Sequence, residues 1–228
     1  MKLILSTHNV TLTKAIEDDG RAQNKSGAAI KTAAVAEAYE LAGNTKAALT
    51  AAREAARLGR QDGVLVTAGA VLARLGADRD IAPIAQELGS RLSPQSRAYA
   101  RILEAMVAMR QNRAVDAIET LRAAQKVADV WLGRLALGEA LVDAGFSPQA
   151  IAELELCQKR RGEASAAFLD DLPTFRYRAQ LVYWLARAQE GVGLQSSAIT
   201  NYRQFLSLRE AAPRDPLAVD ARRRMSTR

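Results

Sequence analysis

The residues best suited to chemistry lie close together between Cys157 and Tyr177. This stretch holds the only cysteine of the chain, two adjacent aspartates and three consecutive basic residues. A cysteine becomes a nucleophile when a neighbouring base or cation favours its thiolate. No histidine is near Cys157 in the sequence, because His8 is the only histidine of the chain. We therefore expect Cys157 to be a small buried side chain rather than a nucleophile.

The adjacent carboxylates Asp170 and Asp171 are the second candidate for chemistry. Paired carboxylates can exchange protons or hold a metal ion when further ligands support them. Neighbouring residues project in different directions, however, and no further histidine or glutamate ligand supports this pair. One cysteine and one histidine also leave no ligand set for zinc. We expect a structural or recognition role for the two aspartates, and we predict no catalytic residue, no metal site and no cofactor.

Three consecutive basic residues, Lys159, Arg160 and Arg161, follow a predicted helix. Cations near the end of a helix interact favourably with its dipole, which is the simpler interpretation. Contact with a phosphate group or an acidic peptide is the alternative, so Arg160 and Arg161 are candidate partner-binding residues.

Aromatic residues are concentrated in the same region. Five of the eleven in the chain lie between positions 168 and 184. Tyr183 and Trp184 fall in a predicted helix, where we expect them to form core. For Phe175 and Tyr177 two interpretations stay open, core packing and contact with a partner.

The elements that carry these residues are predicted to be helices. Hydrophobic residues make up 49% of the 228 positions but aromatic residues only 5%, so small aliphatic side chains must do most of the packing. This composition suits close helix-to-helix contact better than strand pairing. No apolar run approaches the length of a membrane span, and we expect a cytoplasmic protein.

The charge balance is basic, with a net charge of +7. Much of the excess lies at the end of the chain, where seven arginines face three acidic residues from Arg203 to Arg228. A basic balance permits binding to nucleic acid, but a localised tail indicates it less strongly than a stripe along the whole molecule. We expect Arg222–Arg224 to be a solvated helix end.

A turn signal recurs along the helical part of the chain. The intervals are 33, 36, 33 and 48 residues, between Gly43, Gly76, Asn112, Gly145 and Gly193. Five residues after each turn comes a small or aliphatic residue, which would let two helices approach: Ala48, Ile81, Ala117, Ala150 and Ala198. Seven residues later the second helix is expected to bury Ala55, Leu88, Ala124, Cys157 and Phe205. Three of the four intervals are near the 34-residue period of tetratricopeptide repeats, and the chain resembles that family.

The second half resembles a more specific group. The phrases CQKRRGEA, FLDDLPTFRY, YWLARAQEGVG and DPLAVDARRR are similar to the C-terminal tetratricopeptide region of bacterial eukaryotic-like serine/threonine protein kinases. The resemblance covers nearly all of residues 35–225 and implies a sensing or docking module appended to a kinase. The kinase motifs that hold ATP, its metal ions and the catalytic base are absent from the sequence. We therefore expect no enzyme activity.

The first eighteen residues, MKLILSTHNVTLTKAIED, fall outside the repeat pattern. They predict a short strand over residues 2–10 and then a helix beginning near Thr11 or Thr13. This opening resembles the start of ribosome hibernation factors, which implies an alternative function in binding RNA or the ribosome. A flexible leader is the simpler interpretation.

The predicted fold is an all-α tetratricopeptide-repeat solenoid, a right-handed superhelix of helix pairs. It has an N-terminal leader over 1–27 and a repeat domain of about five pairs over 28–225, with an insertion at 159–178. The predicted function is a non-catalytic protein–protein interaction scaffold that binds a peptide or partner protein in a concave groove; nucleic acid is the less favoured partner, and no membrane is expected. The candidate partner-binding residues are Asn44, Arg74, Arg101, Arg134, Glu139, Arg187, Arg160, Arg161, Phe175 and Tyr177.

Overall fold

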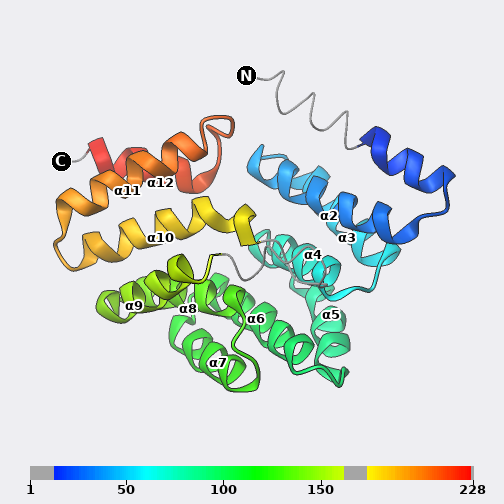
Figure 1. Ribbon diagram of the computed structural model, residues 1–228, viewed down its shortest axis with the longest axis horizontal. Helices are drawn as coiled ribbons and strands as arrows, with labels where there is room; N and C mark the ends of the chain where they lie inside the picture. Colours follow the sequence, from blue (N-terminus) through cyan, green and yellow to red (C-terminus); the bar gives the residue numbers. More distant parts are fainter. Residues whose placement is uncertain (1–12, 162–173, 227–228) are drawn as a thin grey trace.

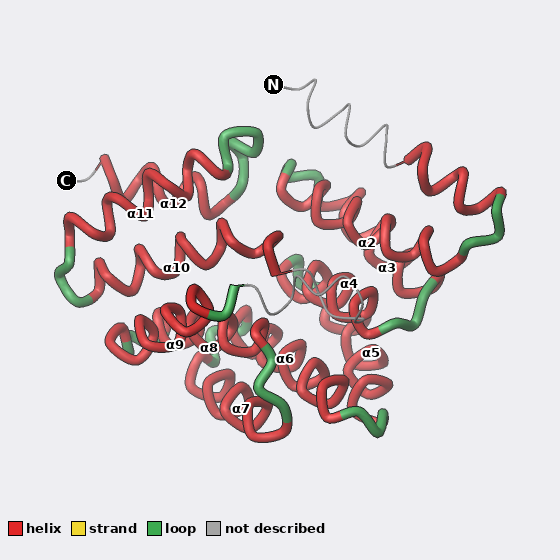
Figure 2. The backbone as a smooth tube through the Cα atoms, viewed as in Figure 1, coloured by secondary structure: helices red, strands yellow, loops and turns green. Residues whose placement is uncertain are grey.

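The computed structural model describes residues 13–161 and 174–226, except for the side chains of residues 174 and 175. Within these ranges the chain is helical, with short connecting turns and no strand (Figure 2). A helix over 13–21 precedes the elements labelled in Figure 1. These are α2 (Lys25–Leu41), α3 (Thr45–Leu58), α4 (Asp62–Arg74), α5 (Asp78–Ser90), α6 (Pro94–Arg110), α7 (Ala114–Val127), α8 (Trp131–Asp143), α9 (Ser147–Lys159), the 3-10 helix η2 (Thr174–Tyr177, unlabelled in the figure), α10 (Arg178–Gly191), α11 (Gln195–Leu208) and α12 (Pro216–Ser226).

The predicted turns are confirmed in position and conformation. Gly43, Gly76, Gly145 and Gly193 have φ angles between 74° and 81°, and Asn112 has a φ of 59°. Each residue lies just past the end of a helix, where the left-handed conformation favours glycine or asparagine. The backbone N–H of the next residue donates to a carbonyl five residues earlier, as Asn44 does to Tyr39 at 2.9 Å. The same hydrogen bond closes all five turns, so one local structure repeats along the chain.

The packing positions predicted after each turn are also confirmed. The residues five positions after a turn are at most 2% exposed, and those twelve positions after it are 0% exposed, Cys157 among them. Small residues let the paired helices come close. A Cβ atom on Gly138 of α8 would lie 2.5 Å from the side chain of Leu154 in α9. In the fourth pair, the side chain of Leu154 therefore packs directly against the backbone of α8.

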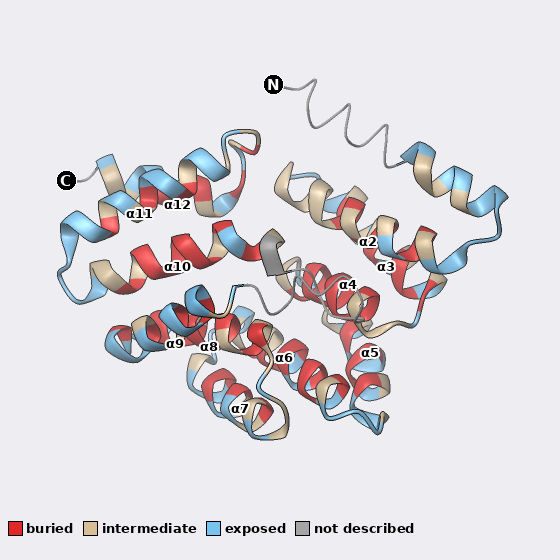
Figure 3. Cartoon of the chain, viewed as in Figure 1, coloured by how far each residue is buried: buried red, intermediate tan, exposed pale blue. Residues whose placement is uncertain are grey.

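The helices form two layers. The first helices of the pairs (α2, α4, α6, α8 and α10) contact one another in sequence order and form what we call the inner layer. The second helices (α3, α5, α7, α9 and α11) form the outer layer; Figure 1 shows α5, α7 and α9 at the edge of the molecule, with α4, α6 and α8 nearer the middle. Inner helices such as α4 and α8 are buried around most of their circumference, whereas α5 buries one stripe (Figure 3). The array curves, so that α2 and the α11–α12 pair lie on the same side of the molecule.

The predicted core aromatics are confirmed. Tyr183 is 1% exposed and Trp184 is 6% exposed. The Tyr183 ring centroid lies 5.0 Å from that of Trp184 and 5.2 Å from that of Phe205 in α11. The fifth pair thus packs several aromatic side chains together, whereas the third and fourth pairs bury single ones, Tyr99 and Trp131.

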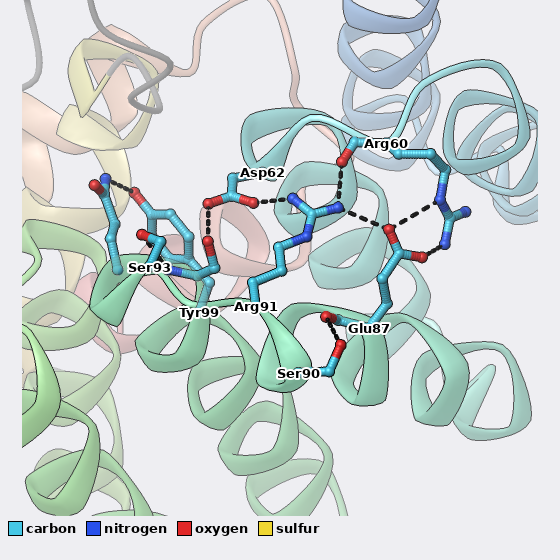
Figure 4. Close-up of polar contacts among 9 residues, drawn as sticks. Arg60, Asp62, Glu87, Ser90, Arg91, Ser93 and Tyr99 are labelled. Carbon is cyan, nitrogen blue, oxygen red and sulfur yellow. Dashed lines mark hydrogen bonds and ion pairs between the residues drawn. The ribbon is translucent and has the colours of Figure 1, made fainter.

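A polar junction ties the second pair to its neighbours (Figure 4). Arg91, which ends α5, forms an ion pair with Asp62 at the start of α4 and donates to the carbonyl oxygen of Arg60 at 2.6 Å. Its guanidinium also reaches Glu87 at 2.7 Å, and Asp62 accepts from Ser96 at 2.5 Å. The loops before α4 and before α6 are therefore held by one arginine.

Several predicted boundaries can be compared with the structure. Helix α2 begins at Lys25, three residues before the predicted start of the repeat domain. The predicted helix start near Thr13 corresponds to the helix over 13–21, while the predicted strand and His8 lie outside the described residues. The predicted insertion falls between α9 and α10, and Asp170 and Asp171 lie in its undescribed part. In the described part of the chain, no helix is long and apolar enough to cross a membrane.

Candidate partner-binding face

Charged side chains of inner-layer helices and two residues of η2 lie near one another, on a surface that we call the inner face. We call them the inner cluster: Glu37 and Glu40 from α2, Arg74 from α4, Glu139 and Asp143 from α8, Arg176 and Tyr177 from η2, and Arg187 from α10. The charges of Arg74 and Arg187 are close enough to Glu139 to lower its pKa, although α6 lies between α4 and α8 in the layer. The curvature of the array therefore brings helices that are not sequence neighbours to one site.

The repeat register explains this convergence. Glu37, Glu139 and Arg187 each lie six residues before a turn glycine, and Arg74 and Asp143 lie two residues before one. Positions four residues apart share one face of a helix. Every first helix therefore presents these two positions on the same side, and a charged residue occupies at least one of them in each of the five pairs; in the third pair this is Arg110, which forms an ion pair with Asp78 of α5.

Arg74 is bound tightly within the cluster. Its Nε and Nη2 atoms donate to the two carboxylate oxygens of Glu40 at 2.6 and 2.7 Å. Burial alone would lower the pKa of Arg74, but the ion pair with Glu40 raises it above the ordinary arginine value. This bidentate ion pair joins α2 to α4 on the inner face.

The short 3-10 helix η2 packs on the same face. Arg176 donates to Thr67 of α4 at 3.1 Å and forms an ion pair with Glu37 of α2 at 3.3 Å. The Tyr177 hydroxyl donates to Glu37 at 3.3 Å, and the Tyr177 ring lies 6.5 Å from that of Trp131. These contacts join residues 109 and 140 positions apart in the sequence. The fifth pair is thereby connected to the first and second.

The interpretation of Tyr177 is thus settled in favour of packing. The side chain is 5% exposed, and burial together with Glu37 raises the pKa of Tyr177 to about 12. Sequence reasoning did not identify Arg176 or Glu37, which carry this contact. Glu37 could have been found by its register, because it shares the position of Glu139 and Arg187.

Two carboxylates of the inner cluster have no partner. Among the described residues, no hydrogen bond or ion pair reaches Glu139 or Asp143, which are one helical turn apart on α8. Burial and the nearby charge of Asp143 raise the pKa of Glu139 to about 8, against the opposing effect of Arg74 and Arg187. Burial also raises the pKa of Asp143. This part of the inner face therefore carries two carboxyl groups that no described side chain pairs, and ionisation of Glu139 is disfavoured there.

The C-terminal helix end is solvated in part, as the sequence predicted: Arg222 and Arg223 are exposed, whereas Arg224 is partly buried and paired. Arg224 forms ion pairs with Asp220 at 2.5 Å and with Glu190 of α10 at 3.2 Å. Despite burial, hydrogen bonds from Tyr183 and Arg224 lower the pKa of Asp220 to about 2. Arg209 lies 3.1 Å from Asp215. Arg209 and Arg224 are thus tied to acidic residues of the fold, while Arg203 and Arg214 are exposed.

Three predicted site residues belong to the inner cluster through their helices, namely Arg74, Glu139 and Arg187. Arg101 and Arg134 do not, because each lies eleven residues before a turn, five positions from an inner one. On an α-helix this is a rotation of about 140°. Arg134 instead pairs with Asp129 and with Glu153 of α9, at 2.7 Å each, and Arg101 is exposed.

The other predicted site residues lie elsewhere. Asn44 caps α3, accepting a hydrogen bond from the backbone N–H of Ala47 at 3.2 Å. Arg160 pairs with Asp129 at 2.8 Å, and Arg161 is exposed. The side chain of Phe175 lies outside the described residues.

Cys157 is structural, as predicted. It is fully buried between α8 and α9, and burial raises the pKa of its thiol to about 12. Trp131 donates to the carbonyl oxygen of Cys157 at 2.8 Å. In the described ranges, no three histidine, cysteine, aspartate or glutamate side chains are grouped as metal ligands would be.

No protein-family model matches this chain, and no curated protein sequence is significantly similar to it. What the chain does must therefore be argued from the inner cluster and the repeated architecture.

Proposed function

We propose that this chain is a non-catalytic protein-interaction module of the tetratricopeptide type, which binds an extended segment of a partner protein on its inner face. The proposal rests on the way in which η2 packs against the inner layer. This short segment lies on the inner layer and is held there by side-chain contacts from Arg176 and Tyr177 to α2 and α4. A face that holds this short segment, which lies outside the helix pairs, has the chemistry to hold another segment.

The repeated architecture supports the tetratricopeptide interpretation. Five helix pairs with the same turn conformation bury the side chains at the same two positions of the second helix. Stacked pairs of this kind bind partners through the surface of their first helices rather than through a catalytic pocket. The sequence resemblance further supports a role as a docking module associated with a bacterial serine/threonine kinase in the cytoplasm.

Binding to RNA or the ribosome is less well supported. The alternative relied on the leader and on the basic C-terminal tail. Arg209 and Arg224 are engaged by Asp215, Asp220 and Glu190, which leaves fewer cations for phosphate groups. Phosphate binding would weaken steeply and linearly with the logarithm of salt concentration, whereas binding of a peptide on the inner face should respond weakly.

A random peptide library displayed against the full chain tests the proposal. Peptides that bind the wild type are then measured against two double variants. Ile30→Arg with Asp143→Arg alters exposed positions on the inner layer, and Val115→Arg with Glu119→Arg alters an exposed apolar and an exposed acidic residue on α7 of the outer layer.

We expect the inner-layer variant to lose binding of most selected peptides by tenfold or more, and the outer-layer variant to keep it. Circular dichroism spectra of both variants verify that each remains helical. Failure to select any peptide would refute the proposed function, and so would peptides that bind both variants as tightly as the wild type.

A further inference from the structure

The first and fourth pairs place a glutamate at the same register position, six residues before the turn glycine. In the first pair this glutamate is Glu37, and its carboxylate receives the guanidinium of Arg176 and the hydroxyl of Tyr177. In the fourth pair it is Glu139, and no described side chain reaches it. Glu37 therefore shows that a glutamate at this register position can bind a guanidinium. Glu139, at the equivalent position, has no such partner among the described residues.

The cations nearest to Glu139 are engaged elsewhere. Arg74 forms its paired hydrogen bonds with Glu40. Arg187 donates to the Tyr183 hydroxyl at 3.2 Å and lies 3.9 Å from Asp220. On its own helix Glu139 faces Asp143, whose charge is also influenced by Arg187 and by Arg224 of α12. The surroundings of Glu139 therefore contain two carboxylates and no cation that is available to them.

The other carboxylates near this site are paired, in contrast to Glu139 and Asp143. Glu40 has Arg74, Glu37 has Arg176, Glu190 has Arg224, and Asp220 has Arg223 and Arg224. An arginine side chain suits this site better than a lysine, because its planar guanidinium can donate to two carboxylates at once.

We propose that Glu139 and Asp143 form the subsite for an arginine side chain of the bound partner segment. This inference rests on the proposed function and specifies the chemistry that the partner must present. The guanidinium would lie between the two carboxylates on α8, as the Arg176 guanidinium lies against Glu37 on α2. An aromatic residue next to that arginine in the partner would contact side chains of the inner layer, as Tyr177 does.

Binding at this subsite should release a proton. Because the pKa of Glu139 is about 8, the carboxyl group is mostly protonated at pH 7 in the free protein. A guanidinium favours the ionised form and lowers that pKa, so the proton leaves as the arginine arrives. The affinity for an arginine-containing peptide should therefore rise as the pH is raised from 6 to 9.

The experiment titrates the full chain with two synthetic probes at pH 8. One probe is acetyl-Phe-Arg-Tyr-amide, which has the sequence of residues 175–177. The other is the same peptide with its arginine replaced by citrulline, a neutral isostere. Amide and side-chain carboxyl signals are followed by nuclear magnetic resonance. We expect saturable binding of the arginine probe, in the millimolar range or tighter, with shifts centred on Glu139 and Asp143. The citrulline probe should bind at least tenfold more weakly.

Matched variants show whether the carboxylates are responsible. Glu139→Gln with Asp143→Asn should weaken the arginine probe at least tenfold, whereas Glu119→Gln with Glu155→Gln, two exposed carboxylates of the outer layer, should leave it unchanged. Calorimetry in two buffers of different ionisation enthalpy should detect close to one proton released by the wild type near pH 7, and far less by Glu139→Gln.

The possible results separate this inference from the proposed function. Equal binding of the two probes, or an unchanged affinity in the Glu139 and Asp143 variant, overturns the arginine subsite. The absence of saturable binding by the arginine probe overturns it as well. If library peptides nevertheless bind the inner face, the proposed function stands and only the arginine subsite is lost; if none do, both fall.

Discussion

Replacing Glu139 with glutamine should reduce the loss of stability that the chain suffers as the pH rises from 5 to 9; Asp143 and Asp215, whose pKa values burial also raises, keep their own smaller contribution. In the folded protein the pKa of Glu139 is about 8, compared with an ordinary value of about 4.5. Between these two values the folded chain binds a proton that the unfolded chain does not. Stability therefore falls as the pH rises through this window and levels off above about pH 8. Glutamine has a similar shape and no charge, so the substitution removes this loss.

The size of the effect follows from the same two values. Each pKa unit corresponds to about 1.4 kcal/mol, which sets an upper limit of roughly 5 kcal/mol for ionising Glu139 in the folded chain. Glu139 is only half-buried, so solvent and rearranged neighbours should reduce this to about 2–4 kcal/mol. For a chain of this length that is a difference in melting temperature on the order of 5 to 10 °C.

Thermal or urea unfolding of the wild type and the variant at several pH values measures the difference. At pH 5 the two proteins should unfold at nearly the same point, and at pH 9 the variant should be the more stable. Glu119→Gln, on the exposed side of α7, serves as the control and should follow the wild type throughout. If the wild type and Glu139→Gln stay parallel from pH 5 to 9, the burial and isolation of this carboxylate have been misjudged.

Three further predictions concern the scaffold. Gly138→Ala should destabilise the fold by about 1–3 kcal/mol, since its Cβ atom would overlap Leu154, while Gly89→Ala, whose Cβ atom would lie 3.7 Å from its nearest neighbour, should be neutral or stabilise it by up to about 1 kcal/mol; urea unfolding compares the two. Asn112→Gly should raise the melting temperature by a few degrees, as its φ of 59° favours glycine, and a lower melting temperature would contradict this. Arg91→Ala should cost about 3 kcal/mol by leaving Asp62 without its charged partner, and should speed hydrogen exchange in the loops on either side; exchange at the wild-type rate would show that the junction is not needed.

The local features of the fold could be read from the sequence because they depend on short segments. A glycine or asparagine just past a helix reports a left-handed turn, and a small residue at a fixed distance from it reports a helix crossing. Gly76 and Ala117 are examples in which both the residue type and the spacing were informative. Cys157 was placed in the core by the same register, with no knowledge of its neighbours.

The inner cluster could be predicted only in part, because it depends on which helices meet across the curved layer. Arg74, Glu139 and Arg187 were identified as candidates, but Arg134 was grouped with them although its register turns it toward Asp129 and Glu153. Counting back from each turn would have separated these arginines. Nothing in the sequence shows that Arg176 reaches Glu37, since that contact spans the whole array.

The state of Glu139 connects the scaffold to its proposed partner. A half-buried carboxylate without a cation is unfavourable when ionised, and two events can relieve this cost, protonation of the carboxyl group or arrival of a guanidinium. The two events exclude each other, because a protonated Glu139 is a poor acceptor for arginine. With a pKa of about 8, protonation and arginine binding compete near neutral pH. At the equivalent position of the first pair, Glu37 already forms an ion pair with Arg176 of the same chain. No external arginine is needed there. The fourth pair is therefore the place on the inner layer where an external arginine would add a contact that the fold does not make for itself.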